Sequence, residues 1–396
     1  MRILFTGGGT GGHIYPILAV VEELQAFAAK RNIHIDLQYL GAPGNFRKLF
    51  VSNGVSVSKI LSAKLRRYFD LRNFLDFILF PISIIQAFWK VFWIMPDVLF
   101  SKGGPGSLPV VIACKFYQIP VIVHDSDSTI GLANKLALSF ASRIAVSFIS
   151  AAEEIVGMQK NAKKAESFRA KIAFVGNPIR PSLFRGLPAQ AGDVLDKQTA
   201  KKMLGFESEK PLMLILGGSQ GSSTINDFML NIAGELVKDW QIFHQTGIDN
   251  FDGVKSELAV VLKGFGEGEK SRYKIVPYFE KNIKDAYCAA DIVVSRASAG
   301  SIFEIAAFGK PSILIPLSEK VVGVHQIRNA YEYAKNGAAV VIEEENLKPH
   351  IFMSQLSKII GDVDLLKKMS EAARNFSKPD AASKIAEEII RLSNMV

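Results

Sequence analysis

Short apolar runs alternate with longer amphipathic stretches along the whole chain, and this alternation restricts the folds that the chain can adopt. The runs form two series, Ile3–Thr6, Ile35–Leu40, Val98–Phe100, Pro120–His124, Ile144–Ser147 and Ile172–Val175, then Leu212–Leu216, Gln241–Gln245, Lys274–Pro277, Ile292–Ser295, Ser312–Pro316 and Ala338–Ile342. Alternation of this kind is typical of βαβ units and parallel sheets. The sequence therefore predicts an α/β protein with two doubly wound, Rossmann-like domains.

The boundary between the two series lies in a polar stretch at 186–210, which contains no long apolar run. The 396 residues are enough for two domains with separate cores. We expect an N-terminal domain at 1–177, a hinge at 178–210 and a second domain at 211–375. A helix in 376–396, with an apolar stripe at Ile385, Ile389 and Leu392, is expected to return to the N-terminal domain. Doubly wound sheets bind ligands outside the carboxyl ends of their strands, here the cleft between the domains.

The charge distribution and the cysteine content indicate which partners the protein can bind and in which cellular compartment it is found. Residues 1–180 carry 21 basic and 11 acidic side chains, so the first half of the chain is expected to face an anionic partner. Two cysteines, Cys114 and Cys288, are too few for a disulfide framework or a four-thiolate zinc site. No signal-peptide pattern opens the chain, so we expect a cytoplasmic protein without a metal or cofactor.

Glycine-rich turns follow the first strand of each predicted domain. The first reads Thr6-Gly7-Gly8-Gly9-Thr10-Gly11-Gly12-His13, and a helix is expected from about Ile14 to Pro16. The second, Gly217-Gly218-Ser219-Gln220-Gly221-Ser222, lacks the Lys-Ser/Thr ending of a P-loop. Such turns bring backbone amides and a helix N-terminus to an anion, for example a diphosphate. His13 either faces the cleft or bonds its own turn.

A further strand of the second half ends at Ser295 and leads into Ala299-Gly300-Ser301-Ile302-Phe303-Glu304. Glu304 lies about one helical turn into the next element, where a carboxylate can accept two ribose hydroxyls. The alternative is a first-turn glutamate that complements the helix dipole. Gln326 and Asn329 follow on one face of a later helix.

Taken together, these motifs resemble one known family. Gly-Gly-Thr-Gly-Gly-His13, Gly-Asn-Pro-Ile-Arg180, Gly-Gly-Ser219-Gln-Gly, Glu304-Ile-Ala-Ala-Phe-Gly-Lys-Pro and His-Gln326-x-x-Asn-Ala look like the MurG family of UDP-N-acetylglucosamine transferases, in order over nearly the whole chain. The resemblance implies the GT-B fold and a peripheral position at the cytoplasmic face of the cell membrane. It also implies inverting transfer of N-acetylglucosamine from UDP to the 4-hydroxyl of the muramic sugar of lipid I, giving lipid II for peptidoglycan synthesis.

The resemblance assigns roles to individual residues. Thr10, Gly11 and Gly12 are expected beside the donor sugar, Arg180 and Ser219 at its diphosphate, and the backbone of Phe279 at the uracil. Ala299, Gly300, Ser301, Ile302 and Phe303 are expected around phosphate and ribose, with Glu304 on the ribose hydroxyls and Gln326 on the sugar. Gly103, Gly104, Ser107 and Asn134 match the acceptor side.

The acceptor side departs from the family pattern at two places. Asp127 stands where the family has a sugar-binding asparagine, and Pro105 stands where it has a tyrosine. An ionised carboxylate only accepts hydrogen bonds, whereas an amide also donates them. His13, Asp127 and Asp125 all remain candidates for the catalytic base, and Asp127 also for donor binding. We interpret Asp125-Ser126-Asp127 as a chance match to the Asp-x-Asp motif of metal-dependent glycosyltransferases.

The stretch 64–93 is both basic and aromatic, with nine aromatic residues between Tyr68 and Trp93. Charges and Pro81 interrupt it too often for a membrane span. We interpret it as an element that docks on anionic lipid, through Arg66, Arg67, Arg72, Phe77, Phe80, Trp89 and Trp93. A helix packed on the first sheet is the alternative.

The expected partners are UDP-N-acetylglucosamine, undecaprenyl-linked lipid I, an anionic membrane surface and, by the resemblance, the cell-wall and division machinery, but no nucleic acid. Three other functions stay open. They are a GT-B enzyme with another lipid acceptor, a UDP-N-acetylglucosamine epimerase and a non-catalytic membrane scaffold.

Overall fold

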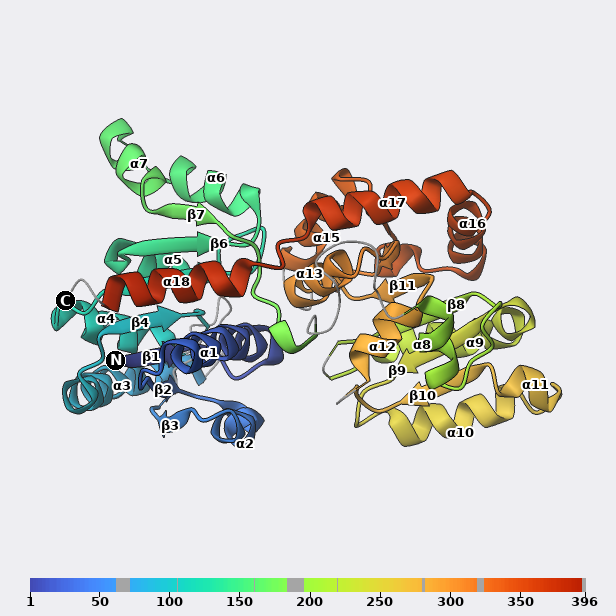
Figure 1. The fold of residues 1–396 in the computed structure, drawn as a ribbon, viewed down its shortest axis with the longest axis horizontal. Coiled ribbons are helices and arrows are strands. Elements are labelled where there is room, and N and C mark those ends of the chain that lie inside the picture. Colours follow the sequence, from blue (N-terminus) through green and yellow to red (C-terminus); the bar gives the residue numbers. More distant parts are fainter. Residues whose placement is uncertain are drawn as a thin grey trace. The chain divides into compact units, whose positions relative to one another are not determined.

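The computed structural model describes residues 1–61, 72–104, 106–159, 161–183, 196–218, 220–279, 282–318 and 324–393, without the side chains of 72–78. The chain forms two compact units. The first comprises Met1–Ser182 and Lys378–Val396, and the second comprises Leu183–Ser377. Each unit is a parallel sheet flanked by helices, as the sequence predicts (Figure 1).

The first unit has a seven-stranded sheet in the order β3-β2-β1-β4-β5-β6-β7. Its strands are β1 (Arg2–Thr6), β2 (Asp36–Gly41), β3 (Ser56–Lys59), β4 (Val98–Ser101), β5 (Val121–Asp125), β6 (Arg143–Val146) and β7 (Ile172–Phe174). Its helices are α1 (Gly11–Arg31), α2 (Arg47–Ser52), α3 (Arg72–Ile94), α4 (Ser107–Phe116), α5 (Leu132–Ala137), α6 (Ile149–Gly157), α7 (Ala162–Arg169) and α18 (Ala381–Ser393). The order reverses between β1 and β4, which is where doubly wound sheets bind ligands.

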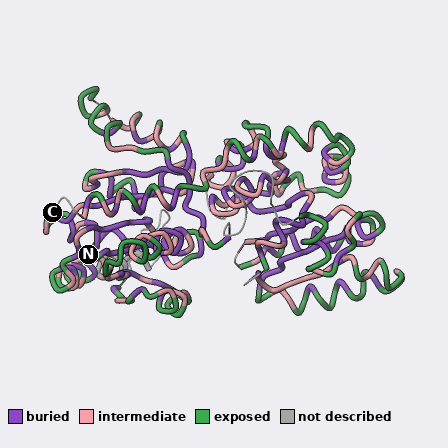
Figure 2. The backbone as a smooth tube through the Cα atoms, in the orientation of Figure 1, coloured by how far each residue is buried: buried purple, intermediate pink, exposed green. Residues whose placement is uncertain are grey.

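Alternating strand residues divide the core of the first unit into two layers. Ile3 and Phe5 pack on one face of the sheet with residues of α1, α2 and α18, while Leu4 packs on the other face with residues of α3, α4 and α6. Successive side chains of a strand point to opposite faces, so a continuous apolar strand needs helices on both sides. The central strands of the sheet are buried, and the backbone tube in Figure 2 is largely purple there.

The C-terminal helix α18 belongs to the first unit although it follows the whole second unit in sequence. Its apolar stripe, Ile385, Ile389 and Leu392, is buried in the layer that contains α1. Glu388 on its outer side pairs with Arg143 of β6 at 2.8 Å. The red helix in Figure 1 lies among the elements of the N-terminal half for this reason.

The second unit has a six-stranded parallel sheet in the order β10-β9-β8-β11-β12-β13. Its strands are β8 (Leu212–Leu216), β9 (Gln241–Gln245), β10 (Tyr273–Val276), β11 (Ile292–Ser295), β12 (Ser312–Leu314) and β13 (Ala339–Val341). Its helices are α8 (Lys197–Met203), α9 (Ser223–Asp239), α10 (Phe251–Val261), α11 (Glu267–Lys270), α12 (Ile283–Ala289), α13 (Ala299–Ala307), α15 (His325–Lys335), α16 (Pro349–Ile360) and α17 (Val363–Phe376). The first glycine turn of this unit again lies where the strand order reverses.

The structure differs from the sequence expectations in three local features. Strand β3 was not expected, because Ser56–Lys59 is a half-exposed edge strand without an apolar run. Helix α1 begins at Gly11, earlier than expected, so His13 lies inside its first turn. Helix α8 occupies part of the stretch expected to be a hinge, and its Lys201 donates to Asp291 at 2.8 Å within the second unit.

Candidate functional site

The glycine turn between β1 and α1 packs against the ring of His13. A Cβ atom on Gly8 would lie 2.8 Å from His13 Nδ1, and one on Gly104 would lie 3.1 Å from His13 Nε2. Both positions therefore require glycine for the ring to fit. Thr10, the residue that precedes α1, lies with its Oγ1 2.9 Å from His13 Nδ1. The imidazole thus bonds its own turn through one nitrogen and faces the turn after β4 with the other.

Burial and a neighbouring cation keep the His13 imidazole neutral. Loss of solvent and the Lys102 ammonium lower the pKa of His13 to about 4, although the Asp127 side chain opposes this change. A histidine with this pKa is unprotonated near neutral pH and can accept a proton. Its low basicity makes a nearby carboxylate useful, because the carboxylate stabilises the imidazolium that forms.

The loop after β5 is shaped by Asp125. Its Oδ1 accepts the backbone amide of Asp127 at 3.1 Å, and its Oδ2 accepts the amide of Gly131 at 3.1 Å and Asn134 Nδ2 at 2.9 Å. Burial, and then the charge of Asp127, raise the pKa of Asp125. Two bonds from its own loop and one from α5 favour a structural role for Asp125 and fix the place from which Asp127 projects.

The acceptor-side residues predicted from sequence lie against this loop. Gly103 has φ +74°, and a Cβ atom there would lie 2.4 Å from Asn134 Oδ1, so only glycine fits. Ser107, at the start of α4, donates its hydroxyl to the carbonyl of Gly104 at 2.9 Å. Pro105 lies outside the described residues. The turn after β4, the loop after β5 and the glycine turn of α1 therefore meet at one edge of the first sheet.

Sequence reasoning missed Lys102, which lies at the centre of this edge. Its side chain is 2% exposed, and its Nζ lies 2.6 Å from His124 Nδ1 and 3.3 Å from Asn177 Oδ1 and also bonds Ser126 Oγ. The available signal was a lysine directly after a buried strand and before a Gly-Gly turn. Its partners come from distant segments, so the sequence alone did not identify it.

Arg180 lies on the segment that leaves β7. Its guanidinium carbon is 4.9 Å from the centre of the Tyr15 ring of α1, and its buried Nε has no hydrogen-bond partner in the described structure. Two residues later, Ser182 donates its amide and hydroxyl to Glu22 at 3.0 and 3.1 Å. Arg180 is therefore held beside α1 with bonding capacity left for an anion.

In the second unit, the turn after β8 is joined to Phe279 through Gln245. Gln245 Nε2 donates to the carbonyl of Gly218 at 2.7 Å, and its Oε1 accepts the amide of Phe279 at 3.2 Å. A Cβ atom on Gly221 would lie 2.1 Å from the carbonyl oxygen of Thr246, so two backbone segments touch there. The Phe279 ring is buried against Phe243, and because Gln245 takes the backbone amide, the carbonyl is the backbone group that Phe279 can offer to a ligand. Ser219 lies outside the described residues.

The run 299–304 forms the start of α13. Ser298 caps this helix by accepting the amide of Ser301 at 3.2 Å. Glu304 accepts the hydroxyl of Tyr287 at 3.1 Å, and a carboxylate has lone pairs for further donors. Gln326, in the first turn of α15, accepts the amide of Leu317 at 3.1 Å through Oε1, which leaves its NH2 group as the donor for a ligand.

Arg296 is a second residue that sequence reasoning passed over. It is 5% exposed and donates to Ser222 Oγ and Glu344 Oε1 at 2.6 Å each, and to the carbonyl of Ile315 at 3.1 Å. Ser222 is the cap of α9 directly after the glycine turn. One buried guanidinium thus links the turn after β8 with the loop that follows β12.

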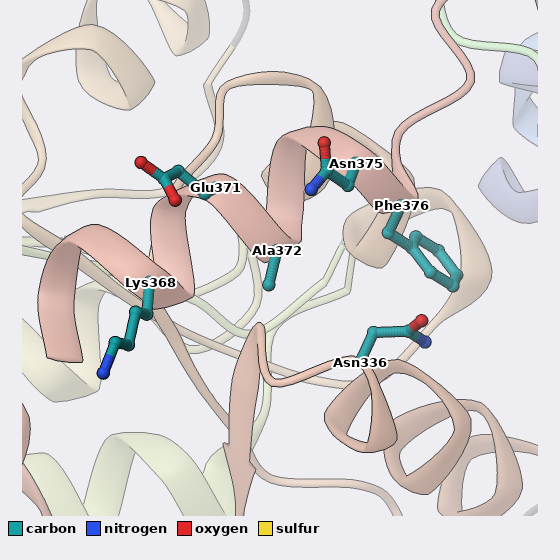
Figure 3. Close-up of a pocket in the computed structure, with 6 residues that line it drawn as sticks. All are labelled: Asn336, Lys368, Glu371, Ala372, Asn375 and Phe376. Atoms are coloured by element: carbon teal, nitrogen blue, oxygen red, sulfur yellow. The ribbon is translucent and has the colours of Figure 1, made fainter.

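One open hollow of about 370 Å³ lies elsewhere on the second unit. Figure 3 shows Lys368, Glu371, Ala372 and Asn375 of α17 around it, with Asn336 opposite and Phe376 at its end. None of the residues predicted to bind donor or acceptor lines this hollow. We therefore place the candidate site at the carboxyl edges of the sheets and not here.

Helix α3 presents an apolar face to solvent. Ile85, Trp89, Phe92 and Trp93 are 70, 65, 51 and 67% exposed, and the next helix adds Phe116 at 67%. The opposite face, with Ala87 and Val91, is buried in the core. Among the described residues, no helix is long and apolar enough to cross a membrane.

The other residues predicted for membrane docking are less well defined. Phe80 is only half-exposed and packs on the core. Arg66 and Arg67 lie outside the described residues, as do the side chains of Arg72 and Phe77.

Comparison with known proteins agrees with this fold. Two parallel-sheet units with glycine turns at their switch points define the GT-B class of glycosyltransferases, and solved structures support it. MurG of Acinetobacter baumannii aligns with a TM-score of 0.68 at 20% identity, over 98% of this chain and 99% of that one. The UDP-GlcNAc 2-epimerase of Neisseria meningitidis aligns with a TM-score of 0.66 at 13% identity, over 99% of this chain and 100% of that one. At such identities the likeness concerns the fold alone.

Sequence relatives define the family. The models of the glycosyltransferase family 28 N-terminal and C-terminal domains match residues 3–146 and 212–385. A protein of Clostridium botulinum is 35% identical over 98% of both chains, and one of Clostridium kluyveri is 35% identical over 90% of this chain and 91% of its own. Both are named UDP-N-acetylglucosamine–N-acetylmuramyl-(pentapeptide) pyrophosphoryl-undecaprenol N-acetylglucosamine transferase. The chain belongs to glycosyltransferase family 28 and, within it, to the MurG family.

Proposed function

We propose that this protein transfers N-acetylglucosamine from UDP-N-acetylglucosamine to the 4-hydroxyl of the muramic sugar of undecaprenyl-pyrophosphoryl-MurNAc-pentapeptide, converting lipid I to lipid II. The observation that carries the proposal is the 35% identity to transferases of this name over 98% of both chains. The glycine turns, Arg180, Glu304 and Gln326 support it because each lies at the carboxyl edge of a sheet or on the segment leaving it.

Transfer with inversion is a single displacement. The acceptor oxygen forms a bond to the anomeric carbon of N-acetylglucosamine while the bond to the diphosphate breaks, and UDP departs with the electron pair. The hydroxyl proton must pass to a base. We assign this role to the neutral His13, with the Asp127 carboxylate stabilising the imidazolium, since Asp127 raises the pKa of His13. A base typically contributes about 100- to 10,000-fold to the rate.

Negative charge gathers on the departing diphosphate. Backbone amides of the glycine turn after β8 and the N-terminus of α9 are suited to hold it, and so is the buried Arg180 Nε–H, which has no partner among the described residues. Preorganised donors of this kind are usually the largest contribution to catalysis. We therefore expect these groups to contribute more to the rate than His13.

Donor recognition is assigned to the second unit. The backbone of Phe279 is proposed to meet the uracil, and the α13 N-terminus, Ala299 to Phe303, to surround phosphate and ribose. Glu304 would accept the ribose hydroxyls beside its bond from Tyr287. Gln326 would donate its NH2 group to the sugar, and Thr10, Gly11 and Gly12 are proposed on the family resemblance to contact the same sugar.

The decisive experiment is release of UDP from UDP-N-acetylglucosamine by the purified protein, with and without a short-chain lipid I analogue in detergent. Acceptor-dependent UDP release with a disaccharide product is expected. Acceptor-independent UDP release with N-acetylmannosamine would instead indicate an epimerase. If the protein binds the donor without turnover, lipid I is not its acceptor. That result would favour a transferase with another lipid acceptor or a non-catalytic scaffold.

We further propose that α3 docks the protein on the cytoplasmic face of an anionic membrane. Ile85, Trp89, Phe92, Trp93 and Phe116 are exposed although large and apolar, and contiguous exposed patches of this type mark interaction surfaces. Trp89 and Trp93 stack edge to face at 5.9 Å, which keeps the patch together. Basic residues nearby in sequence, Arg66, Arg67, Arg72 and Lys90, add attraction to anionic lipid of about 1 kcal/mol each.

A lipid-linked acceptor explains why a transferase would carry such a surface. Contacts with the cell-wall and division machinery are proposed on the family resemblance alone.

A further inference from the structure

The buried amine of Lys102 joins three segments of the first unit. Lys102 directly follows β4, and its backbone amide donates to the carbonyl of Thr6 at the end of β1. Its Nζ contacts His124 and Ser126 at the end of β5, and Asn177, which follows β7 by three residues. Asn177 is itself three residues before Arg180. One side chain therefore connects the acceptor-side loop with the segment that carries the proposed diphosphate ligand.

The hydrogen-bond directions around Lys102 follow from its partners. His124 Nε2 lies 3.0 Å from the carbonyl of Gly176, and a carbonyl only accepts, so Nε2 carries the proton and Nδ1 is an acceptor. Ser126 donates its hydroxyl to Asn177 Oδ1 at 2.9 Å, which leaves lone pairs toward Lys102. Three acceptors thus surround Nζ, and they match the three N–H bonds of an ammonium and exceed the two of a neutral amine.

The charged groups around the Lys102 amine include the residues that we assign to proton transfer. Burial lowers the pKa of Lys102 to about 7, although Asp125 and Asp127 act to raise it. The Lys102 charge in turn lowers the pKa values of His13 on α1 and His124 on β5, in each case after burial. Asp125 and Asp127 from the β5 loop and the two histidines are the titratable groups that the structure couples to Lys102.

We propose that Lys102 is a positioning residue of the transfer reaction, whose ammonium holds the β5 loop and the Asn177 segment together and sets the charge around His13 and Asp127. Because it is buried, Lys102 acts through these residues and does not touch substrate. A cation beside a base favours the unprotonated form of that base, here the imidazole of His13. Lys102 therefore keeps the acceptor side ready to take a proton at mildly acidic pH.

The first test is a histidine NMR titration, which needs no turnover. The ring Cε1–H signal of His13, assigned with His13→Gln, is followed from pH 3.5 to 9 in the wild type and in Lys102→Met. The pKa of His13 is expected near 4 in the wild type and higher by roughly one pH unit in the variant. Lys30→Met is the matched control, since Lys30 is exposed in the last turn of the same helix α1, and it should leave the curve unchanged.

An unchanged His13 titration in folded Lys102→Met would overturn the proposal. Lys102→Gln, which keeps two N–H donors but no charge, gives the same test if the methionine variant fails to fold.

The second test rests on the proposed function. In a plot of kcat/KM against pH, the acid limb of Lys102→Met should move to higher pH, while a purely structural role would lower the whole curve without moving the limb. Because the NMR titration does not depend on activity, failure of the transferase assignment and failure of the Lys102 assignment give different results.

Discussion

His13 and Asp127 are rivals for the proton of the acceptor hydroxyl, and two variants separate them. We expect His13→Ala to lower kcat by roughly 100- to 10,000-fold, the usual contribution of a general base. Asp127→Ala should lower it less, because the carboxylate only stabilises the imidazolium. Steady-state rates at saturating donor measure both. If Asp127→Ala lowers kcat more than His13→Ala does, Asp127 is the general base. If neither variant lowers kcat by tenfold, another group is the base.

The pH dependence of the wild type follows from the same residue. His13 has a pKa of about 4 because of burial and the Lys102 charge, and only its unprotonated form accepts a proton. The rate should therefore stay level as pH falls from 7 to about 5 and decline only as pH approaches 4. Measurement of kcat/KM across this range checks it. A decline centred near 6.5, the ordinary histidine value, would show that His13 is solvated during catalysis.

Arg296 offers a residue-scale test of the donor half. Arg296→Met leaves the half-buried Glu344 carboxylate without its guanidinium partner, and the loss of folding free energy should stay below the about 3–5 kcal/mol that is typical of a fully buried pair. It also releases Ser222, so the KM for UDP-N-acetylglucosamine should rise. Urea unfolding and donor titration measure these effects. The double variant Arg296→Met with Glu344→Gln should recover part of the lost free energy of unfolding. If the single and double variants lose the same amount, the broken ion pair is not the cause.

At the scale of elements, helix α3 carries the membrane prediction. Replacing Trp89 and Trp93 with serine removes two exposed indoles, which should lower partitioning onto anionic vesicles at least tenfold. Flotation with and without anionic lipid measures this. Val363→Ser is the matched control, because Val363 is 76% exposed but lies on α17 of the second unit. Docking through this element would be ruled out if vesicle binding stayed unchanged in the double tryptophan variant and also in a variant with Arg66, Arg67 and Arg72 replaced by glutamate.

Glycine turns are the elements that the sequence predicted best. Their position after the first strand of each unit, and the glycine needed where the backbone meets His13, follow from local chemistry. The start of α1 was less predictable, since Gly11 and Gly12 are poor helix formers and yet the helix includes both. Edge strand β3 lacked the apolar run that identified the others.

For the whole molecule, buried neutral histidines predict destabilisation by acid. The pKa values of His13 and His244 fall to about 4 and about 3 in the folded protein because both rings are buried. In the unfolded protein these histidines bind protons below about pH 6.5. Their contribution to the free energy of unfolding is therefore fully present above that pH. It is lost as pH falls toward the pKa values of the folded protein, by about 1.4 kcal/mol for each histidine and each pH unit. The urea concentration at the midpoint of unfolding should therefore be lower at pH 5 than at pH 7.

His244→Gln should flatten this decline, since an amide side chain can hydrogen-bond the Tyr273 hydroxyl in either direction but does not titrate in this range. His34→Gln is the control, because His34 is exposed. An equal decline in the wild type and His244→Gln would assign acid sensitivity to other groups.

The sequence by itself determined the strands other than β3, the glycine turns, the α/β class and the family, because apolar periodicity and glycine chemistry are properties of neighbouring residues. Tertiary structure alone decided which polar groups meet. Lys102 and Asn177 are 75 residues apart, and Arg296 and Glu344 are 48 apart. A buried charge finds its partners only when parallel strands bring their carboxyl ends to one edge, and its pKa depends on that burial. The fold was therefore readable from the chain, whereas the electrostatics of the candidate site were not.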